Sequence, residues 1–524
     1  MSAPTHDHPL AVRASSRFGT AWWGFLVAVT LLGAGLRLTN LEGKPYWFNE
    51  VFTSLKMSGW DEHRDANPAL YTGAIVSAAD VQRYQRLRPG SSAVAVAATL
   101  ARKDVKWPPG YSLLARAWAT AWGSSPRAMR SLPALLSLLA FPALYWLCRE
   151  LFARRDVAWT ALALHAVSPL FLQEAQSARA WGLTDVLVLT VTAVMLWALR
   201  RGTAAAWAAY GLLVSANLWV NPASLLLLAV HAVYMVSDRV RRQALRQWTL
   251  AAGGGLLSFA PWAALIVWNF ANAVATSNHL RVWPGLGGMI DVWTAGLLAV
   301  FVVPPDGPLA WLMVAALVAL VIHAAWFLAR VAPPAPRLLV LLLIASALVC
   351  VVLPDVVFHT QVSSRARYLL ITWIGMQLAV AYLLAVRAEG SDWRAAAWQA
   401  VAAGLLLSGS ATCIAAVRAD TWWGLSAGDV VAGRILARAA NPLVLTKSNF
   451  GTLTPLTYEV APETPFILFG RNTPLVLPPW DGEIFAYRPA PELAEALRRY
   501  GVLRPACELP DTPEGCFLQR LERP

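Results

Sequence analysis

The chain has 524 residues, of which 57% are apolar and 14% are charged, compared with about 45–50% and about 25% in ordinary soluble domains. This composition excludes a soluble cytosolic enzyme. It also excludes a disordered protein, because disorder needs low hydrophobicity and high charge density, and five cysteines are too few for a disulfide scaffold. The sequence therefore predicts a polytopic membrane protein.

The net charge is +13, from 43 basic and 30 acidic residues. The basic residues lie mainly in the connections between apolar runs, whereas a nucleic-acid-binding protein gathers them in one patch or stripe. We therefore expect no nucleic-acid partner, whereas a polytopic membrane protein has membrane lipids as partners.

About eleven apolar runs are long enough to cross roughly 30 Å of hydrocarbon, which takes about 20 residues each. They are 21–38, 128–148, 157–173, 181–200, 204–220, 222–237, 248–270, 309–328, 338–354, 367–387 and 395–417. A further run, 289–303, is short and lies between Gly287-Gly288 and Pro304-Pro305. We expect this run to be re-entrant or interfacial.

Arginines cluster in every second connection between the predicted spans. The basic connections are 149–155, 200–201, 239–246, 330–337 and 387–394. Cytoplasmic loops carry the Lys/Arg excess, so these connections are expected in the cytoplasm together with the leader 1–20. The loop 39–110 and the C-terminal segment 418–524 are then outside, which predicts an integral protein of a bacterial inner membrane or plasma membrane.

Residues 418–524 differ from the transmembrane region 21–417 in composition. They contain many prolines, short apolar runs at 443–445 and 466–469, and a helical stretch at 491–500, which together predict a small α/β domain. Cys507 and Cys516 are separated by eight residues, so a disulfide could close this loop in an oxidising compartment. Two unpaired thiols are the alternative.

The first candidate site follows the first span, at Tyr46-Trp47-Phe48-Asn49-Glu50. The aromatic residues are typical of a membrane–water interface. Asn49 is a suitable helix N-cap, and Glu50 then lies in the first turn, where the helix dipole favours negative charge. A capping role alone is one interpretation of this pair.

Four segments together resemble the GT-C superfamily of membrane glycosyltransferases, in the branch of protein O-mannosyltransferases and bacterial aminoarabinose transferases. They are Phe48–Thr53, Trp107–Leu114, Pro169 with Ala175–Trp181, and Arg365–Leu369. The resemblance covers about residues 20–417. It implies an all-α GT-C-like bundle and inverting transfer of a sugar from a polyprenyl-phosphate carrier to an extracytoplasmic glycan, lipid or protein.

This reaction needs a base for the acceptor hydroxyl and cations for the departing phosphate. The resemblance makes Asn49 and Glu50 the catalytic candidates. The candidate substrate-binding residues are Lys106, Glu174, Arg179, His359, Arg365, Arg367 and Tyr368. Arginine suits this role because its guanidinium group binds phosphate oxygens in pairs.

The sequence departs from the family pattern at three ionisable positions: Asn49 replaces an Asp, Trp107 a His and Ser177 a Glu. An amide cannot accept a proton at neutral pH, so Glu50 is the remaining carboxylate of the pair. The departures leave open a non-catalytic relative that binds a lipid-linked glycan or acts as a scaffold in envelope polysaccharide assembly. A transporter is disfavoured because the chain shows no duplicated halves.

No cofactor is predicted. The eight histidines are scattered and form no His-x-x-x-His pair. A divalent cation shared by Glu50 and a carrier phosphate is chemically allowed, but no residue spacing indicates one.

Overall fold

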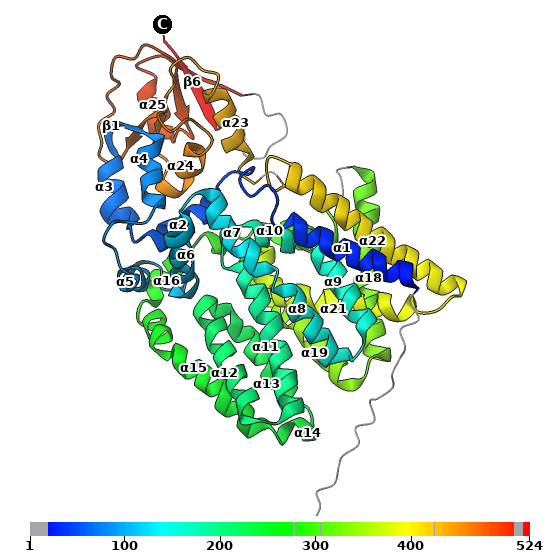
Figure 1. Ribbon diagram of the computed structural model, residues 1–524. Coiled ribbons are helices and arrows are strands. Elements are labelled where there is room, and N and C mark those ends of the chain that lie inside the picture. Colours follow the sequence, from blue (N-terminus) through cyan, green and yellow to red (C-terminus); the bar gives the residue numbers. More distant parts are fainter. Residues whose placement is uncertain (1–18, 276–277, 304–306, 424, 508–516, 524) are drawn as a thin grey trace, which may run out of the picture.

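The computed structural model describes residues 19–275, 278–303, 307–423, 425–507 and 517–523 (Figure 1). A bundle of apolar helices forms one lobe, and a mixed α/β lobe sits at one end of it. The bundle helices are α1 (Thr20–Leu36), α7 (Pro126–Ser137), α8 (Ala140–Phe152), α9 (Arg155–Ala166), α10 (Pro169–Gln176), α11 (Trp181–Arg201), α12 (Ala204–Val220), α13 (Leu225–Val236), α14 (Arg239–Arg242), α15 (Leu245–Trp268), α16 (Phe270–Ala275), α17 (Gly285–Phe301), α18 (Pro308–Val331), α19 (Pro334–Ala347), α20 (Leu353–Phe358), α21 (Leu370–Arg387) and α22 (Trp393–Arg418).

Seven helical segments in the described part of the chain are long and apolar enough to cross a membrane. They are Pro126–Phe152, Trp181–Arg201, Leu245–Trp268, Ala310–Val331, Pro334–Phe358, Ala366–Arg387 and Trp393–Arg418. Shorter apolar helices cover the predicted runs at 21–38, 204–220 and 222–237. The protein is therefore an integral membrane protein, whereas the count of about eleven spans remains a prediction.

The predicted span 157–173 is not one helix. Helix α9 ends at Ala166, and α10 begins at Pro169. Proline lacks the N–H that would continue the helix, and it disfavours helical backbone in the residue before it. The break turns the chain into the segment that carries Glu174 and Arg179.

Residues 289–301 of the short run 289–303 belong to one continuous helix, α17, of 17 residues. This length is below the about 20 residues that a span needs. Helix α17 packs against α10 and against two 3₁₀ turns, η6 (Val362–Ser364) and η7 (Ala366–Leu369). Helix α17 therefore contacts the turns that adjoin Arg365 and contain Arg367. A re-entrant or interfacial position of this helix remains a prediction.

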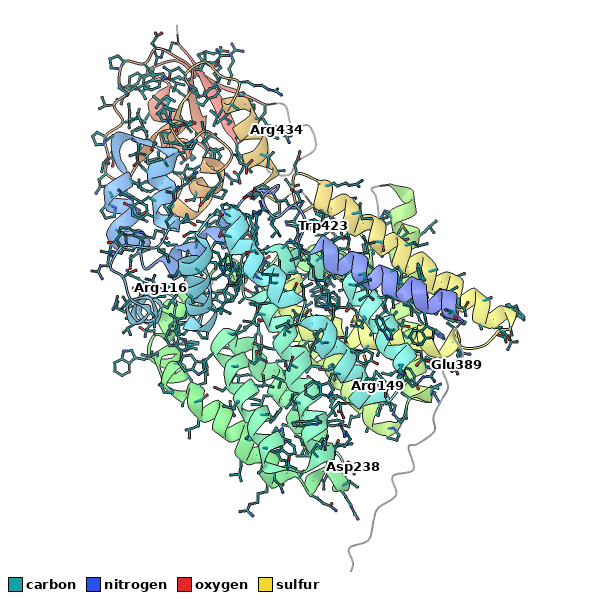
Figure 2. All side chains as sticks on the ribbon, in the orientation of Figure 1. Arg116, Arg149, Asp238, Glu389, Trp423 and Arg434 are labelled. Carbon is teal, nitrogen blue, oxygen red and sulfur yellow. The ribbon has the colours of Figure 1, made fainter. Side chains whose placement is uncertain are left out.

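The basic connections gather at one end of the bundle. Arg149, Asp238 and Glu389 lie at the end away from the α/β lobe, whereas Trp423 and Arg434 lie near that lobe (Figure 2). At the far end, Arg154 pairs with Glu389 at 2.8 Å. Residues of the basic connections and residues near the α/β lobe therefore lie at opposite ends of the bundle (Figure 2).

The α/β lobe combines the first loop with the C-terminal segment. Its sheet has the order β1-β3-β2-β4-β6-β5. The strands are β1 (Thr72–Ser77), β2 (Leu443–Thr446), β3 (Pro465–Phe469), β4 (Ile484–Tyr487), β5 (Val502–Pro505) and β6 (Leu518–Glu522). The pairs β2–β3 and β2–β4 are parallel, and the other neighbouring pairs are antiparallel.

Strand β1 comes from the first loop and pairs with β3, with Thr72 opposite Phe469 and Ser77 opposite Pro465. The predicted loop 39–110 and the predicted domain 418–524 therefore share one sheet and one hydrophobic core. The helices of this lobe are α2 (Phe48–Ser58), α3 (Asn67–Leu70), α4 (Ala78–Gln82), α5 (Ala93–Lys103), α6 (Pro109–Trp122), α23 (Ala427–Leu436), α24 (Phe450–Thr457) and α25 (Pro491–Leu497). Cys507 is disulfide-bonded, and its predicted partner Cys516 lies outside the described residues.

A close crossing of α1 and α9 fixes the position of the chain just before the first candidate site. A Cβ atom on Gly33 would lie 2.2 Å from the carbonyl oxygen of Ala166. The buried Arg37 guanidinium donates to the carbonyl oxygens of Gly33, His165 and Ala166. Small residues permit such backbone contact between apolar helices.

Substitution of Gly33 by Ala is expected to separate α1 from α9 and to destabilise the protein by about 1–3 kcal/mol. Gly35 on the same helix is the matched control, because a Cβ atom there meets nothing within 4 Å. Thermal unfolding in detergent should show a lower midpoint for Gly33→Ala and no loss for Gly35→Ala. Equal midpoints would contradict the tight crossing.

Candidate functional site

Helix α2 begins directly after the first span and carries both predicted catalytic residues. We expected Asn49 to be the N-cap of this helix, but the N-cap is Trp47. Glu50 lies in the first turn, as predicted, and its Oε2 accepts the Trp47 backbone N–H at 3.3 Å. The helix therefore starts with the acidic half of a capping box, in which the Glu50 side chain accepts the backbone N–H of the N-cap residue.

Glu50 is completely buried, with 0% of its surface exposed. Arg130 of α7 donates to both carboxylate oxygens, with Nε–Oε1 at 2.8 Å and Nη2–Oε2 at 2.6 Å. The Ala178 backbone N–H donates to Oε1 at 2.7 Å. With its oxygens occupied in this way, Glu50 holds α2, α7 and the 177–180 turn together.

Arg130 also donates hydrogen bonds to backbone carbonyl oxygens. Its Nη1 donates to the carbonyl oxygens of Leu41 and Lys44, each at 2.9 Å, and Nη2 donates to Pro45 at 2.6 Å. The segment between α1 and α2 is thereby tied to α7. The Glu50–Arg130 pair is a structural clamp under the site.

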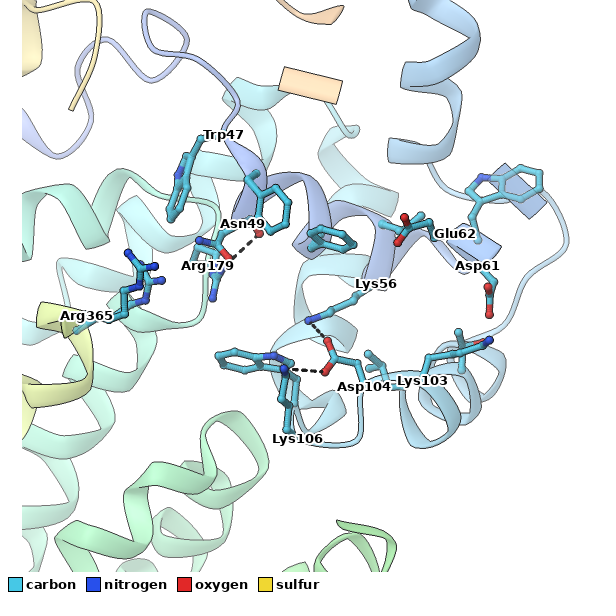
Figure 3. Close-up of a pocket in the computed structure, with 18 of the residues that line it drawn as sticks. Trp47, Asn49, Lys56, Asp61, Glu62, Lys103, Asp104, Lys106, Arg179 and Arg365 are labelled. Atoms are coloured by element: carbon cyan, nitrogen blue, oxygen red, sulfur yellow. Dashed lines mark hydrogen bonds and ion pairs between the residues drawn. The ribbon is translucent and has the colours of Figure 1, made fainter. Parts of the chain in front are cut away.

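A cavity of about 920 Å³ opens beside α2 (Figure 3), within the usual size of small-molecule sites. Its charged lining residues are Lys56, Asp61, Glu62, Lys103, Asp104, Lys106, Arg179, Arg365 and Arg367. Its aromatic lining residues are Trp47, Phe48, Phe52, Trp60, Trp107 and Tyr368. The cavity thus combines many positive charges with apolar walls.

Three arginines form one wall of the cavity: Arg179, Arg365 and Arg367. In the described residues none of the three lies within ion-pair distance of a carboxylate. The buried Arg367 Nε has no hydrogen-bond partner among the described residues. Burial and repulsion from Arg367 lower the pKa of Arg179 to about 10 and also lower the pKa of Arg365. The buried Glu174 carboxyl group attracts Arg179 and Arg367 and offsets part of their charge, and the excess of positive charge that remains is suited to an anion.

Lysines add a second group of cations next to Trp107. Lys56 pairs with Asp104 at 2.7 Å, and Lys106 lies 3.9 Å from the same carboxylate. Lys56 and Arg179 both lie over the Trp107 ring, at 5.1 and 5.5 Å. Burial lowers the pKa of both lysines. Trp107 therefore provides a flat cation–π surface at the position where the family pattern has His.

The loop that carries Arg365 and Arg367 is anchored by Asp355. This buried carboxylate accepts the Val362 N–H at 3.0 Å, and both the N–H and the hydroxyl of Ser363 at 2.5 Å. Thr360 donates to it as well. The backbone just before the two arginines is therefore held in place, which reduces the conformational entropy that is lost when they bind a ligand.

The structure brings together six of the nine predicted site residues. Asn49, Lys106, Arg179, Arg365, Arg367 and Tyr368 line the cavity. Glu50, Glu174 and His359 are absent from its described lining. His359 instead packs against Trp283, with ring centroids 5.5 Å apart, and Glu174 is buried on α10, where desolvation raises its pKa. The catalytic role of Glu50 remains a prediction, and the structure pairs its oxygens with Arg130 and backbone donors.

Sequence reasoning missed Lys56, Asp61, Glu62 and Asp104. A helical pattern could have found Lys56, because Asn49, Phe52 and Lys56 lie at i, i+3 and i+7 and so share one face of α2. All three line the cavity. The acidic residues lie in turns without periodicity, so no sequence pattern indicates them.

No family model and no curated protein matches this sequence. Among solved structures, ArnT from Cupriavidus metallidurans bound to undecaprenyl phosphate matches with a TM-score of 0.51 and 13% identity. The match covers 96% of this chain and 98% of that chain. The chain has the GT-C fold.

The apo form of the same ArnT matches the GT-C fold of this chain equally, with a TM-score of 0.51 and 13% identity over 96% and 98% of the two chains. An Archaeoglobus fulgidus oligosaccharyltransferase has a TM-score of 0.47 and 14% identity over 84% of this chain and 63% of that one. At these identities the ArnT match establishes the GT-C fold, while the residues of the cavity must supply the argument for function.

Glu50→Gln is expected to destabilise the protein strongly, because it leaves the Arg130 guanidinium buried without its counter-charge. Breaking a buried ion pair costs about 3–5 kcal/mol. Arg498→Ala is the control, since Arg498 pairs with Glu495 on the exposed face of α25, where such pairs contribute about 0–1 kcal/mol. Thermal unfolding of the two variants measures the difference, and a Glu50→Gln midpoint equal to wild type would contradict the clamp.

Proposed function

We propose that this protein is an inverting membrane glycosyltransferase that moves a sugar from a polyprenyl-phosphate carrier to an extracytoplasmic acceptor. The observation that carries the proposal is a wall of three arginines in a cavity beside apolar helices. None of the three has a carboxylate within ion-pair distance in the described part of the chain. A phosphate group supplies the missing negative charge. The GT-C fold, which this chain shares with a protein solved with undecaprenyl phosphate, supports a lipid carrier.

The proposed reaction fits the distribution of charge in the cavity. The bond between the sugar and the carrier phosphate breaks, and negative charge develops on the departing phosphate. Fixed guanidinium groups stabilise that charge in the transition state without reorganisation. The Trp107 ring and the Lys56–Asp104 pair border the same space and would contact the sugar.

The side of the membrane follows from the arginine pattern. The cavity lies at the end of the bundle that joins the α/β lobe, opposite Arg149 and Glu389 (Figure 2). If the basic connections face the cytoplasm, the cavity and the lobe are outside. A flipped lipid-linked sugar is available there, and the acceptor is an envelope glycan, lipid or protein.

A non-catalytic lipid-glycan binder is the second candidate. Asn49 lines the cavity but cannot accept a proton, and Glu50 is occupied by Arg130. The deciding experiment incubates the purified protein with labelled polyprenyl-phosphate sugar and a panel of envelope acceptors. Acceptor-dependent release of carrier phosphate supports the transferase, whereas carrier binding without release for every donor and acceptor supports the binder.

Arg367→Ala is expected to weaken binding of undecaprenyl phosphate about 10- to 100-fold, the effect of losing a charge-assisted hydrogen bond of about 1.5–3 kcal/mol. Arg367→Lys should lose less affinity, because lysine keeps the positive charge but cannot form the two parallel hydrogen bonds of a guanidinium group. Arg394→Ala serves as a control, because Arg394 is exposed and begins α22 at the other end of the bundle. Binding is measured by titration in nanodiscs. Similar affinities for Arg367→Ala and Arg394→Ala would argue against the phosphate site.

A further inference from the structure

The cavity has an acidic end opposite its arginine wall. Asp61 and Glu62 follow α2 and lie across the cavity from Arg179 and Arg365 (Figure 3). Glu62 begins a π-helical turn, η1 (Glu62–Ala66), a conformation that is frequent at functional sites. The cavity therefore has a cationic side and an acidic side with space between them.

Three carboxylates line this cavity in the described part of the chain, Asp61, Glu62 and Asp104, and two of them are already used by the protein. Asp61 Oδ1 accepts the backbone N–H groups of His63 and Arg64, at 2.9 and 3.0 Å, and so caps η1. Asp104 is paired with Lys56, and Glu50 is clamped by Arg130. In the described part of the chain, Glu62 has no lysine, arginine or histidine within ion-pair distance.

The surroundings of Glu62 suit an acceptor of protons. Desolvation raises the pKa of its carboxyl group, with smaller opposing contributions from His63 and from the Asn67 side chain that donates to it, and a raising contribution from Asp61. Tyr71 faces it from the segment beyond α3, and Lys103 of α5 lies on the same side of the cavity (Figure 3). A carboxylate of raised pKa is a better base near neutral pH than an ordinary one.

We infer that Glu62 is the catalytic base that removes the proton from the acceptor hydroxyl. This inference rests on the proposed transferase function. The acceptor O–H bond breaks and its proton passes to a Glu62 oxygen. The acceptor oxygen forms a bond to the anomeric carbon, the bond from that carbon to the phosphate oxygen breaks, and its electron pair leaves with the carrier phosphate toward the arginines.

With Glu62 as the base, the reaction does not require a carboxylate at position 49. The amide at position 49 lines the cavity and Arg179 Nη1 donates to its backbone carbonyl at 3.2 Å, so the residue holds an arginine in place. The base is supplied from the opposite side of the cavity, where an acceptor can lie between Glu62 and a sugar whose phosphate contacts Arg179 and Arg365.

The test compares wild type, Glu62→Gln, Glu62→Asp and the exposed control Glu495→Gln, each checked for thermal stability. Carrier-phosphate release and carrier binding are measured separately across pH. We expect Glu62→Gln to lower kcat about 100-fold or more, with carrier affinity within threefold of wild type. The wild-type rate should fall as the pH drops below the raised pKa of Glu62, and Glu62→Gln should lose this dependence. Glu62→Asp should retain partial activity, and Glu495→Gln should match wild type.

Turnover of Glu62→Gln within threefold of wild type overturns the base assignment and leaves the transferase intact. A parallel loss of carrier affinity and kcat also overturns it, because that result describes a binding residue. If Glu62→Gln does not fold, Glu62→Asp decides: an unchanged rate and pH profile overturn the assignment. Wild type that binds carrier but never releases it overturns the transferase itself, and the base role with it.

Discussion

The ion pair between Glu50 and Arg130 is the contact on which the arrangement of the site depends. One carboxylate and one guanidinium group, both buried, connect the start of α2, helix α7, the 41–45 segment and the 177–180 turn. A buried pair repays its desolvation only when geometry and additional hydrogen bonds are favourable. Here every side chain oxygen of Glu50 and both terminal nitrogens of Arg130 are hydrogen-bonded, so the pair can act as a rigid support.

Next to this ion pair, the protein holds three positively charged arginines close to one cavity. Arg179 follows the turn that is tied to Glu50, and Arg365 and Arg367 follow the turn that is tied to Asp355. Separate anchors therefore hold three like charges near one cavity, against their mutual repulsion and against burial. Such an arrangement costs stability in the empty protein, and a bound anion would recover that cost.

The four sequence motifs grouped the three arginines that line one cavity, but they did not indicate the ion pair between Glu50 and Arg130. Arg179, Arg365 and Arg367 could be grouped because each lies in a motif of the GT-C resemblance. Arg130 could not, since it lies 80 residues from Glu50 and a pairing over that distance leaves no periodic pattern. The family position suggested chemistry for Glu50, but no sequence pattern indicated that both of its oxygens accept hydrogen bonds from Arg130 and from backbone groups.

Two features of the fold illustrate different limits of sequence reasoning. The break between α9 and α10 at Pro169 follows from proline chemistry, but the continuous hydrophobicity of 157–173 obscured it. Strand β1 could not be foreseen, because Thr72–Ser77 has no regular alternation of buried and exposed residues and its partner strand begins at Pro465. Only tertiary pairing makes that segment a strand.

A structure of the purified protein with bound undecaprenyl phosphate tests the central claim most directly. We expect the phosphate in the cavity, with its oxygens about 2.7–2.9 Å from guanidinium nitrogens of the arginine wall, and Glu50 still bound to Arg130. A phosphate held elsewhere, or a Glu50 side chain released from Arg130 into the cavity, would contradict it.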